Sequence, residues 1–310
     1  MGRGDLSDAE CEGLRPFLPV SNGRCGRWRD HRQVIDGILH RVRTGVQWRD
    51  LPERFGPWKT VYERHRLWSA DGTWERLLQQ VQAAADAAGE IDWDISVDST
   101  IIRAHQHAAG ARTDPPPAPR AKGAGRDGTP GRDAVARARC PPGGGRAAGE
   151  GLGRSRGGFT SELHLSADGR CRPVSLIVTP GQRADCTQFK PVLEKIRVPR
   201  LEPGRPRKKP DSLAADRAYS NGLVRNYLRR RGIRHTIPEK TDSQAARQRR
   251  GSRGGRPPGF DEDRYRKRNT VERAINRLKQ FRAVATRYDK RGYVFLGTVT
   301  AAAVAIWLRT

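Results

Sequence analysis

The sequence predicts an α/β protein: a mixed sheet flanked by helices, preceded by an all-helical N-terminal region. Apolar residues and tryptophans recur at helical spacing up to about residue 89. From residue 91 onward, short apolar or alternating segments typical of strands begin. Their order is three strands, then helix, strand, helix, strand, helix. This order predicts antiparallel pairs first and helical crossovers later, which together give a mixed sheet.

The N-terminal helices begin at a capping box, because Ser7 stands three residues before Glu10. Further helices are expected over residues 60–70 and from Thr73, and another is indicated by a periodic apolar set: Val34, Ile35, Ile38, Leu39 and Val42. Helices joined by short turns, with Arg64 and Arg66 exposed, are compatible with a DNA-binding helix-turn-helix. The alternative is a plain helical bundle that packs on the following domain. We place the boundary after residue 89.

The strands are expected at five places. Residues 91–104 form the first strand, and residues 160–166 and 172–179 form a hairpin around the Asp168-Gly169 turn. A helix from Thr187 leads to a short apolar strand over residues 212–215. After another helix comes the last strand, over residues 233–237. The apolar stretch 292–308 is too rich in small residues for a membrane span and is interpreted as a buried core helix.

Three segments read as irregular. Residues 108–157 are rich in Gly, Pro, Ala and Arg, which predicts a disordered basic insert. Residues 204–209 form a basic loop that is similar to a minor-groove hook, although solvated charge is the more common explanation. Residues 240–259 are expected to form a second basic, glycine-rich loop.

The segment 265–279 is expected to form one helix with a single carboxylate among cations. Asp261 is positioned to cap its N-terminus. On an ideal helix, four polar residues fall within about 60° of one another beside an apolar face; they are Tyr265, Arg268, Glu272 and Lys279. A surface helix with solvated ion pairs is the alternative to a site.

The chain is strongly basic, with 60 Lys and Arg against 34 Asp and Glu among 310 residues and a formal net charge of +26. Such an excess indicates a polyanionic partner. We prefer nucleic acid to a membrane, because no lipidation motif or isolated basic amphipathic helix is present. Part of the charge can reflect a high-GC genome. The five scattered cysteines form no CxxC pair, which predicts a reducing cytoplasm and no structural zinc.

Three acids are candidate ligands because of their positions: Asp98 on the first strand, Asp216 at the end of the fourth, and Glu272 on the late helix. Carboxylates at strand ends meet ligands at the edge of an open sheet. Such oxygen ligands suit Mg²⁺ or Mn²⁺, and two ions could promote phosphodiester displacement. Asp92 and Asp94 are rivals of Asp98. His105 and His107 are either accessory groups or exposed polar residues.

These residues resemble a known family. Tyr265, Arg268, Glu272 and Lys279 reproduce, at the same spacings, the Tyr-Arg-Glu-Lys signature of DDE-type insertion-sequence transposases. Residues 216–219 are similar to the segment around the family's second acid, and residues 97–100 to that around its first. Residues 153–158, 179–182 and 286–290 and the Trp-rich stretch 45–58 resemble the insertion-sequence-five branch. The insert has no counterpart in this likeness.

The resemblance implies a ribonuclease-H-like catalytic domain over residues 90–310, with Asp98, Asp216 and Glu272 as ligands of two Mg²⁺ or Mn²⁺ ions. It implies that Tyr265, Arg268 and Lys279 hold the DNA end. Residues 1–89 would bind the element's terminal inverted repeats. The protein would cut and join these repeats to target DNA, as a homodimer in the active complex, on the nucleoid in a bacterial cytoplasm.

Two alternatives remain at this stage. One is a protein that binds the repeats without cutting them, either as a repressor or as a decayed transposase copy. It requires only residues 1–89 and the basic loops. The other is a general metal-dependent nuclease, which would show no preference for repeats and would give no joined product.

Overall fold

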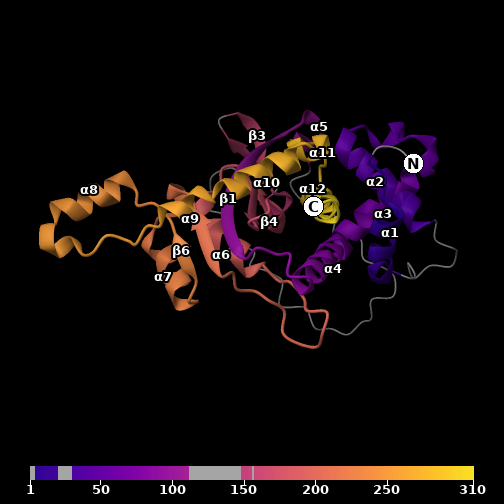
Figure 1. The fold of residues 1–310 in the computed structure, drawn as a ribbon. Coiled ribbons are helices and arrows are strands. Elements are labelled where there is room, and N and C mark those ends of the chain that lie inside the picture. Colours follow the sequence, from indigo (N-terminus) through magenta and orange to yellow (C-terminus); the bar gives the residue numbers. More distant parts are fainter. Residues whose placement is uncertain (1–3, 20–29, 112–147, 156) are drawn as a thin grey trace, which may run out of the picture.

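The computed structural model describes residues 4–19, 30–111, 148–155 and 157–310. Within them, a seven-stranded mixed sheet forms the centre of the α/β part of the chain, as predicted (Figure 1). The strands are β1 (Asp94–Ala104), β2 (Gly153–Ser155), β3 (Gly158–Ala167), β4 (Pro173–Pro180), β5 (Ser212–Ala215), β6 (Arg234–Thr236) and β7 (Thr286–Arg287).

The sheet has the predicted mixture of strand directions. Its order is β2-β3-β1-β5-β6, with β4 also on β3 and β7 also on β1. β3 pairs antiparallel with both β1 and β4, which confirms the hairpin around Asp168-Gly169. β5 is parallel to β1, and β6 is parallel to β5. Parallel neighbours require crossovers, and these include α6 (Asp185–Glu194) before β5 and α7 (Gly222–Arg230) before β6.

The described part of the N-terminal region contains four α-helices: α1 (Asp8–Leu14), α2 (His31–Thr44), α3 (Trp58–Ala70) and α4 (Thr73–Ala87). The capping box is confirmed, because the Ser7 hydroxyl accepts from Glu10 N and Glu10 accepts from Ser7 N. The apolar set predicted for α2 is buried in full. These helices gather at one end of the molecule, beside α12 (Gly292–Leu308) and away from β6 (Figure 1).

The remaining helices surround the sheet. They are α5 (Gln106–Ala109), α6 (Asp185–Glu194), α7 (Gly222–Arg230), α8 (Thr241–Arg249), α9 (Glu262–Arg266), α10 (Asn269–Lys279) and α11 (Arg282–Ala285). Short 3-10 turns cover Arg15–Phe17, Trp48–Asp50, Glu53–Phe55, Ala148–Glu150, Arg217–Tyr219 and Gly251–Gly254. α10 crosses the sheet over β1 and β3, whereas α8 projects from the body (Figure 1).

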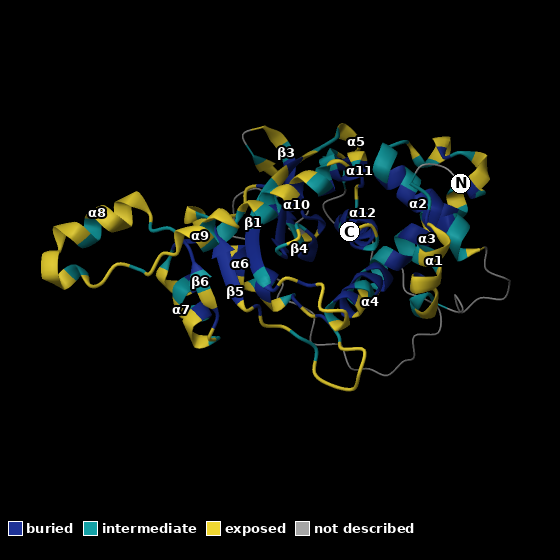
Figure 2. Ribbon diagram, in the orientation of Figure 1, coloured by how far each residue is buried: buried dark blue, intermediate teal, exposed yellow. Residues whose placement is uncertain are grey.

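The core is continuous from the N-terminal helices to the sheet, and α12 joins the two parts. Almost every residue of α12 is buried, as predicted for a core helix, and it packs on α3, α4 and β4 (Figure 2). Small residues along α12 permit this close approach. At Gly297, for example, an added Cβ would lie 1.9 Å from Ser69 Oγ. No described helix is both long and apolar enough to cross a membrane.

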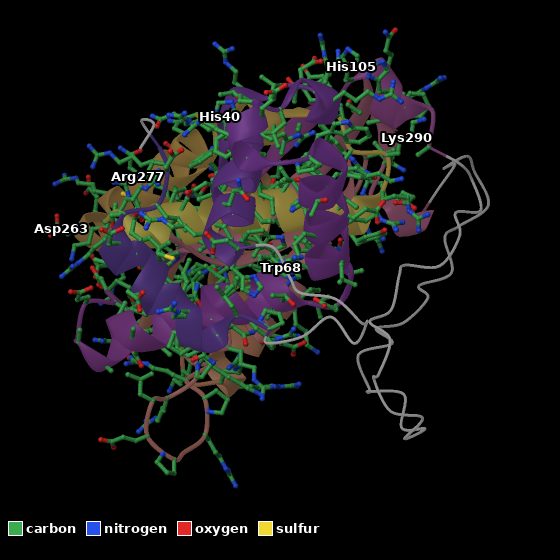
Figure 3. All side chains as sticks on the ribbon, turned by 90° about the vertical axis from the view of Figure 1, so that its right-hand side faces the viewer. His40, Trp68, His105, Asp263, Arg277 and Lys290 are labelled. Carbon is green, nitrogen blue, oxygen red and sulfur yellow. The ribbon has the colours of Figure 1, made fainter. Side chains whose placement is uncertain are left out.

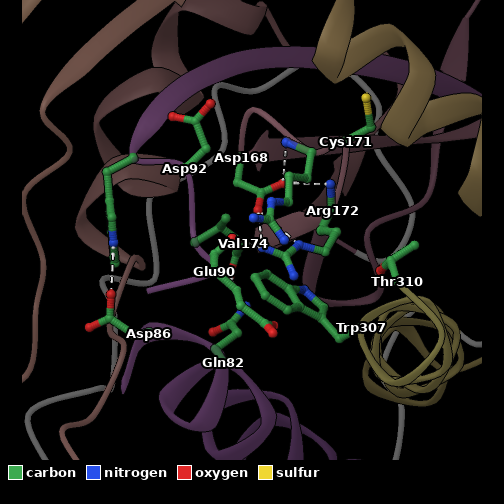
Figure 4. A network of polar contacts seen from close by, with 12 residues as sticks. Gln82, Asp86, Glu90, Asp92, Asp168, Cys171, Arg172, Val174, Trp307 and Thr310 are labelled. Atoms are coloured by element: carbon green, nitrogen blue, oxygen red, sulfur yellow. Dashed lines mark hydrogen bonds and ion pairs between the residues drawn. The ribbon is translucent and has the colours of Figure 1, made fainter. Parts of the chain in front are cut away.

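A buried ion pair fastens the β3–β4 hairpin to α12. The Arg172 guanidinium donates to Asp168 Oδ2 from Nε at 2.8 Å and from Nη2 at 2.7 Å (Figure 4). It lies 3.9 Å from the ring centroid of Trp307, at the end of α12. Nη2 also donates to the carbonyl of Glu90 at 2.7 Å. Neither charged side chain is more than 1% exposed, so the pair depends on these contacts.

Two predictions about the basic surface are wrong. Arg64 is buried rather than exposed, with its guanidinium 5.5 Å from the Trp68 ring centroid. Residues 241–249 form helix α8 instead of a loop. α8 buries no side chain, so the sequence has no apolar periodicity that could predict it. Arg207, in the predicted minor-groove loop, stacks on Trp93 at 4.1 Å and pairs with Asp211.

The predicted disordered insert is too wide at both ends. Ala108 belongs to α5 and is buried, and Leu152 is buried ahead of β2, which pairs with β3. Glu150 is also buried, and its carboxylate accepts from Gly292 N at the start of α12. Apolar residues scattered among glycines gave no strand signal in this stretch. The rest of the prediction, residues 112–147, lies outside the described residues.

Candidate active site

Asp98 and Asp216 stand side by side because of the register between two parallel strands. Val97 on β1 is paired with Ala215, the last residue of β5, and each acid is the next residue along the chain. Asp216 then caps the following 3-10 turn, where its Oδ1 accepts from Arg217 N at 2.6 Å. The strand order therefore brings together two carboxylates that lie 118 positions apart in the sequence.

Glu272 is linked to Asp98 through Arg268. Arg268 Nη1 donates to Asp98 Oδ2 at 3.2 Å, and Nη2 donates to Glu272 Oε1. α10 is held over β1 by its apolar face and by the Thr270 hydroxyl, which donates to Ser96 Oγ at 3.3 Å. Since Ser96 and Asp98 are two residues apart on β1, both face α10. The three predicted acids therefore share one face of the sheet.

The three acids also act on one another electrostatically. Burial raises the pKa of Asp98, and the charges of Asp216 and Glu272 raise it further. The hydrogen bond from Ser99 N and the charge of Arg268 act in the opposite direction on this pKa. Arg268 thus occupies the place where a cation is most needed, and its own pKa is raised by Glu272 and Asp98, against a lowering by burial.

The signature residues lie at different distances from the acids. The Tyr265 ring centroid is 5.7 Å from the Arg268 guanidinium carbon, and the Phe260 ring packs on it with centroids 5.3 Å apart. Lys279 lies two turns beyond Glu272 on α10, about 10 Å along the axis. Burial lowers the pKa of Lys279. No hydrogen bond or ion pair within the described part of the chain joins Lys279 to the acids.

The predicted single helix over 265–279 is wrong in one respect. It is broken into α9 and α10, with Lys267 ending the first and Arg268 preceding the second. Asp261 caps α9 as predicted, accepting from Arg264 N at 3.0 Å. The break leaves Arg268 free of a regular helical ladder, and its side chain reaches both Asp98 and Glu272.

The rival acids and the histidines lie elsewhere. Asp94 is four residues before Asp98, where it accepts from the Ser212 hydroxyl. Asp92 is exposed and precedes the strand. His105 and His107 follow the opposite end of β1, with ring centroids 4.6 Å apart. None of these four is brought to the three acids.

A second polar group, which the sequence did not reveal, lies on the other face of β1. Glu162, His164 and Asp185 have ligand-type atoms within 4.8 Å of one another, the one such metal-competent set among the described residues. The Ser99 hydroxyl contacts Glu162 Oε1 at 3.1 Å and Asp185 Oδ1 at 2.9 Å. Ser99 follows Asp98, so successive side chains of β1 serve opposite faces. Polar residues at alternate positions of the buried strand β3 were the sequence signal that could have revealed this group.

The two carboxyl groups of this second set lie close enough for Asp185 to raise the pKa of Glu162. Burial and the neighbouring Asp185 raise the pKa of Glu162 to about 8, so Glu162 is protonated at neutral pH. Burial lowers the pKa of His164 to about 4, and its Nε2 lies 2.8 Å from the Thr179 hydroxyl. At neutral pH, the group therefore contains a protonated Glu162 and a neutral His164 imidazole.

Glu162→Gln is expected to make the folded protein more stable above neutral pH. The folded-state pKa of Glu162 is raised above its unfolded value, so the folded state binds more protons between about pH 4.5 and 8, and stability falls as pH rises through that window. Glutamine keeps a donor without this dependence. Urea unfolding at pH 6 and 8.5 measures the free energy of unfolding at each pH. Between these two values it should fall less in the variant than in the parent protein, by about 1 kcal/mol. An equal loss in both proteins would contradict the assigned protonation.

Comparison with known protein families shows to which family the chain belongs. The family described as “Transposase DDE domain” matches residues 91–307, well over half of the chain. The chain belongs to the DDE transposases. A second family, described as “Putative transposase of IS4/5 family”, matches residues 6–78 of the transposase. The function is therefore DNA transposition, with the dependence on DNA and divalent metal that the family implies, and the predicted insertion-sequence resemblance is confirmed.

Two of the curated relatives that the chain resembles are named as transposases. The transposase is 40% identical over 108 residues to “Uncharacterized protein y4sN” of Sinorhizobium fredii, across 34% of this chain and 82% of the relative. It is 27% identical over 151 residues to “Putative transposase for insertion sequence element IS6501” of Brucella ovis, across 49% of this chain and all of the relative. It is 30% identical over 131 residues to “Putative transposase for insertion sequence element IS402” of Burkholderia cepacia, across 42% of this chain and 54% of the relative. No solved structure matches the transposase.

Proposed function

We propose that this transposase binds the terminal inverted repeats of its insertion sequence, cuts the DNA strands there and joins them to target DNA, with Asp98, Asp216 and Glu272 as its catalytic acids. The observation that carries the proposal is the register of β1 and β5, which sets Asp98 beside Asp216 under Arg268 and Glu272. The outcome of the reaction is cut-and-paste transposition.

The three acids fit a divalent metal. They are oxygen donors, the set that Mg²⁺ and Mn²⁺ prefer. Their mutual repulsion, visible in the raised pKa of Asp98, is relieved by added positive charge. We propose two such ions, held by Asp98, Asp216 and Glu272. When bound, they would supply an activated water or 3′-hydroxyl and stabilise the leaving oxygen.

The cations around the acids position the DNA. Residues 217–282 contain 20 Lys and Arg against 6 Asp and Glu. We propose that Tyr265, Arg268 and Lys279 hold the DNA end, since Arg and Lys bind phosphate oxygens and Tyr265 offers a ring for a displaced base. Arg268 then has two alternative partners, the carboxylates before metal binding and a DNA phosphate afterwards.

Arg268→Ala is expected to tighten Mn²⁺ binding to the DNA-free protein, about 3-fold or more, while weakening cleavage of the DNA end. The guanidinium contacts both Asp98 and Glu272 and so competes with the metal for them. Calorimetric titration with Mn²⁺ measures the first effect. Arg273→Ala, an exposed cation on the same helix, is the matched control. Weaker Mn²⁺ binding in Arg268→Ala would show that Arg268 does not compete.

We further propose the division into a helical DNA-binding domain over residues 1–89 and a ribonuclease-H-like catalytic domain over 90–310. The antiparallel β1–β3–β4 set, extended by parallel β5 and β6, supports this fold. The active complex would be a homodimer that bridges both element ends and the target on the bacterial nucleoid. A protein that binds the repeats without cutting is the second candidate.

Incubation of the purified protein with its flanking repeats and Mn²⁺ tests the function. Cleavage at the repeat ends followed by a joined strand-transfer product is expected. Repeat binding without any cut product would favour the non-catalytic candidate. Cutting without repeat preference or joining would favour a general nuclease. Affinity for the repeats should fall steeply as salt rises, because many phosphates are contacted.

A further inference from the structure

A described cavity that lies apart from the acids has a volume of about 740 Å³. It lies between the N-terminal helices and the far end of β1, bounded by residues 45–50, α3, His105, His107 and residues 288–291. Figure 3 shows His105 and Lys290 at one end of the molecule, with Asp263, which precedes the signature residues, toward the other. Its volume lies within the range of about 300–1,000 Å³ of small-ligand sites.

A buried arginine points to an anion in this cavity. Arg41, on α2, lines the cavity and is only 3% exposed. Its Nη2 lies 3.4 Å from Asp289 Oδ1, but Nε and Nη1 have no hydrogen-bond partner in the structure. Buried polar groups are almost always paired, and an unpaired guanidinium donor is costly. A guanidinium with two unpaired donors in a residue that lines a cavity suits a phosphate, which Arg binds through paired donors.

The cavity also offers aromatic faces. The Arg41 guanidinium lies 5.0 Å from the ring centroid of Trp48, and Arg49 lies 5.9 Å from that of Trp58. On the opposite wall, the His105 and Tyr288 ring centroids are 4.8 Å apart. Trp58 and Tyr288 line the cavity and are only partly buried, whereas the Trp48 ring also packs against Tyr62 and His65. Aromatic rings beside cations are the combination that stacks nucleic-acid bases and holds their phosphates.

We propose that this cavity binds one unstacked nucleotide of a DNA strand, with its phosphate on Arg41 and its base against the aromatic rings. The proposal rests on the DNA-binding function of the transposase and adds a second contact to it, separate from the acids and from Tyr265, Arg268 and Lys279. A flipped or single-stranded base meets both requirements, whereas neighbouring bases cover the faces of a paired base inside a duplex. A free mononucleotide shares the same chemistry.

The test uses a five-nucleotide single strand of thymidines with 2-aminopurine at its centre. Its fluorescence should fall on binding to the full chain, because stacking on aromatic rings quenches it. Arg41→Gln and Trp58→Leu should each weaken binding about 10-fold or more, the scale of one base stack. Arg15→Gln, an exposed cation on the 3-10 turn after α1, is the matched control and should bind as the parent protein does. Thermal melting checks the fold of each variant, and Trp58→Leu keeps the test decisive if Arg41→Gln does not fold.

Two further probes separate the possible ligands. The same strand with an abasic site in place of 2-aminopurine should bind at least about 5-fold more weakly. Equal binding of the abasic strand, or equal binding by Trp58→Leu, would overturn the proposal. Deoxyadenosine monophosphate should compete more weakly than the strand, and tighter binding of the mononucleotide would overturn the assignment to DNA. Because the probe carries no terminal-repeat sequence, its outcome is independent of repeat recognition and cleavage.

Discussion

Replacing Asp98, Asp216 or Glu272 by alanine is expected to lower DNA cleavage and strand transfer by about 10³-fold or more. Each replacement removes one proposed metal ligand, and losing a preorganised charge at a reacting phosphate costs at least as much as losing one oxyanion donor. Binding of the terminal repeats should stay within about 3-fold, because the cations that contact phosphates are unchanged. Gel assays of cleavage and of binding measure the two effects separately.

Asp92→Ala is the matched control for these variants. It is an exposed acid near the start of β1, away from Arg268, and should leave cleavage unchanged. Asp98→Ala also removes one anion from the partly buried contact with Arg268, so its melting temperature must be measured alongside. Full cleavage by all three alanine variants, with intact folds, would show that these acids are not the catalytic set.

Arg172→Ala is expected to destabilise the fold more than any other single replacement proposed here, by about 3–5 kcal/mol. The replacement leaves the Asp168 carboxylate, which is 0% exposed, without its cation in a dry environment. Part of the effect is also lost packing of the guanidinium against Trp307. Urea unfolding measures the change. The β3–β4 hairpin that this pair fastens pairs directly with the strand that carries Asp98.

A double variant separates charge from packing. Asp168→Asn combined with Arg172→Met removes both charges while retaining most of the volume, so it should recover much of the stability lost in Arg172→Ala. Arg266→Ala, which breaks an exposed pair with Glu262, is the surface control and should cost less than about 1 kcal/mol. A loss below about 1 kcal/mol in Arg172→Ala would mean that water or a rearranged partner satisfies Asp168.

The acids could be found from the sequence because each sits where regular structure gives a signal. Asp98 lies within an apolar strand, Asp216 ends one, and Glu272 lies beside an apolar helical face. The hairpin turn and the buried character of α12 followed from equally local patterns. What the sequence could not provide was the pairing of Val97 with Ala215, since register between distant strands depends on the packing of the whole sheet.

The failures have a common physical origin in side chains whose environment is set by distant residues. Arg64 was expected in solvent, but its guanidinium lies against Trp68. Glu162 and Asp185 belong to separate elements and meet only across Ser99. The break between α9 and α10 is not marked by Gly or Pro, so no local rule predicts it. α8 is a helix without a buried face, which leaves no hydrophobic pattern to read.

β1 fixes the distance between the acids and the aromatic cavity. Asp98 lies on this strand and His105 follows directly after it, so seven residues of extended chain separate the acids from the aromatic cavity, about 23 Å. Duplex DNA rises about 3.4 Å along its axis for each base pair, so that length corresponds to roughly seven base pairs. Because β1 is paired with β3 through this stretch and with β7 at its end, this separation cannot adjust to the DNA. Any strand that engages both sites must therefore conform to the protein.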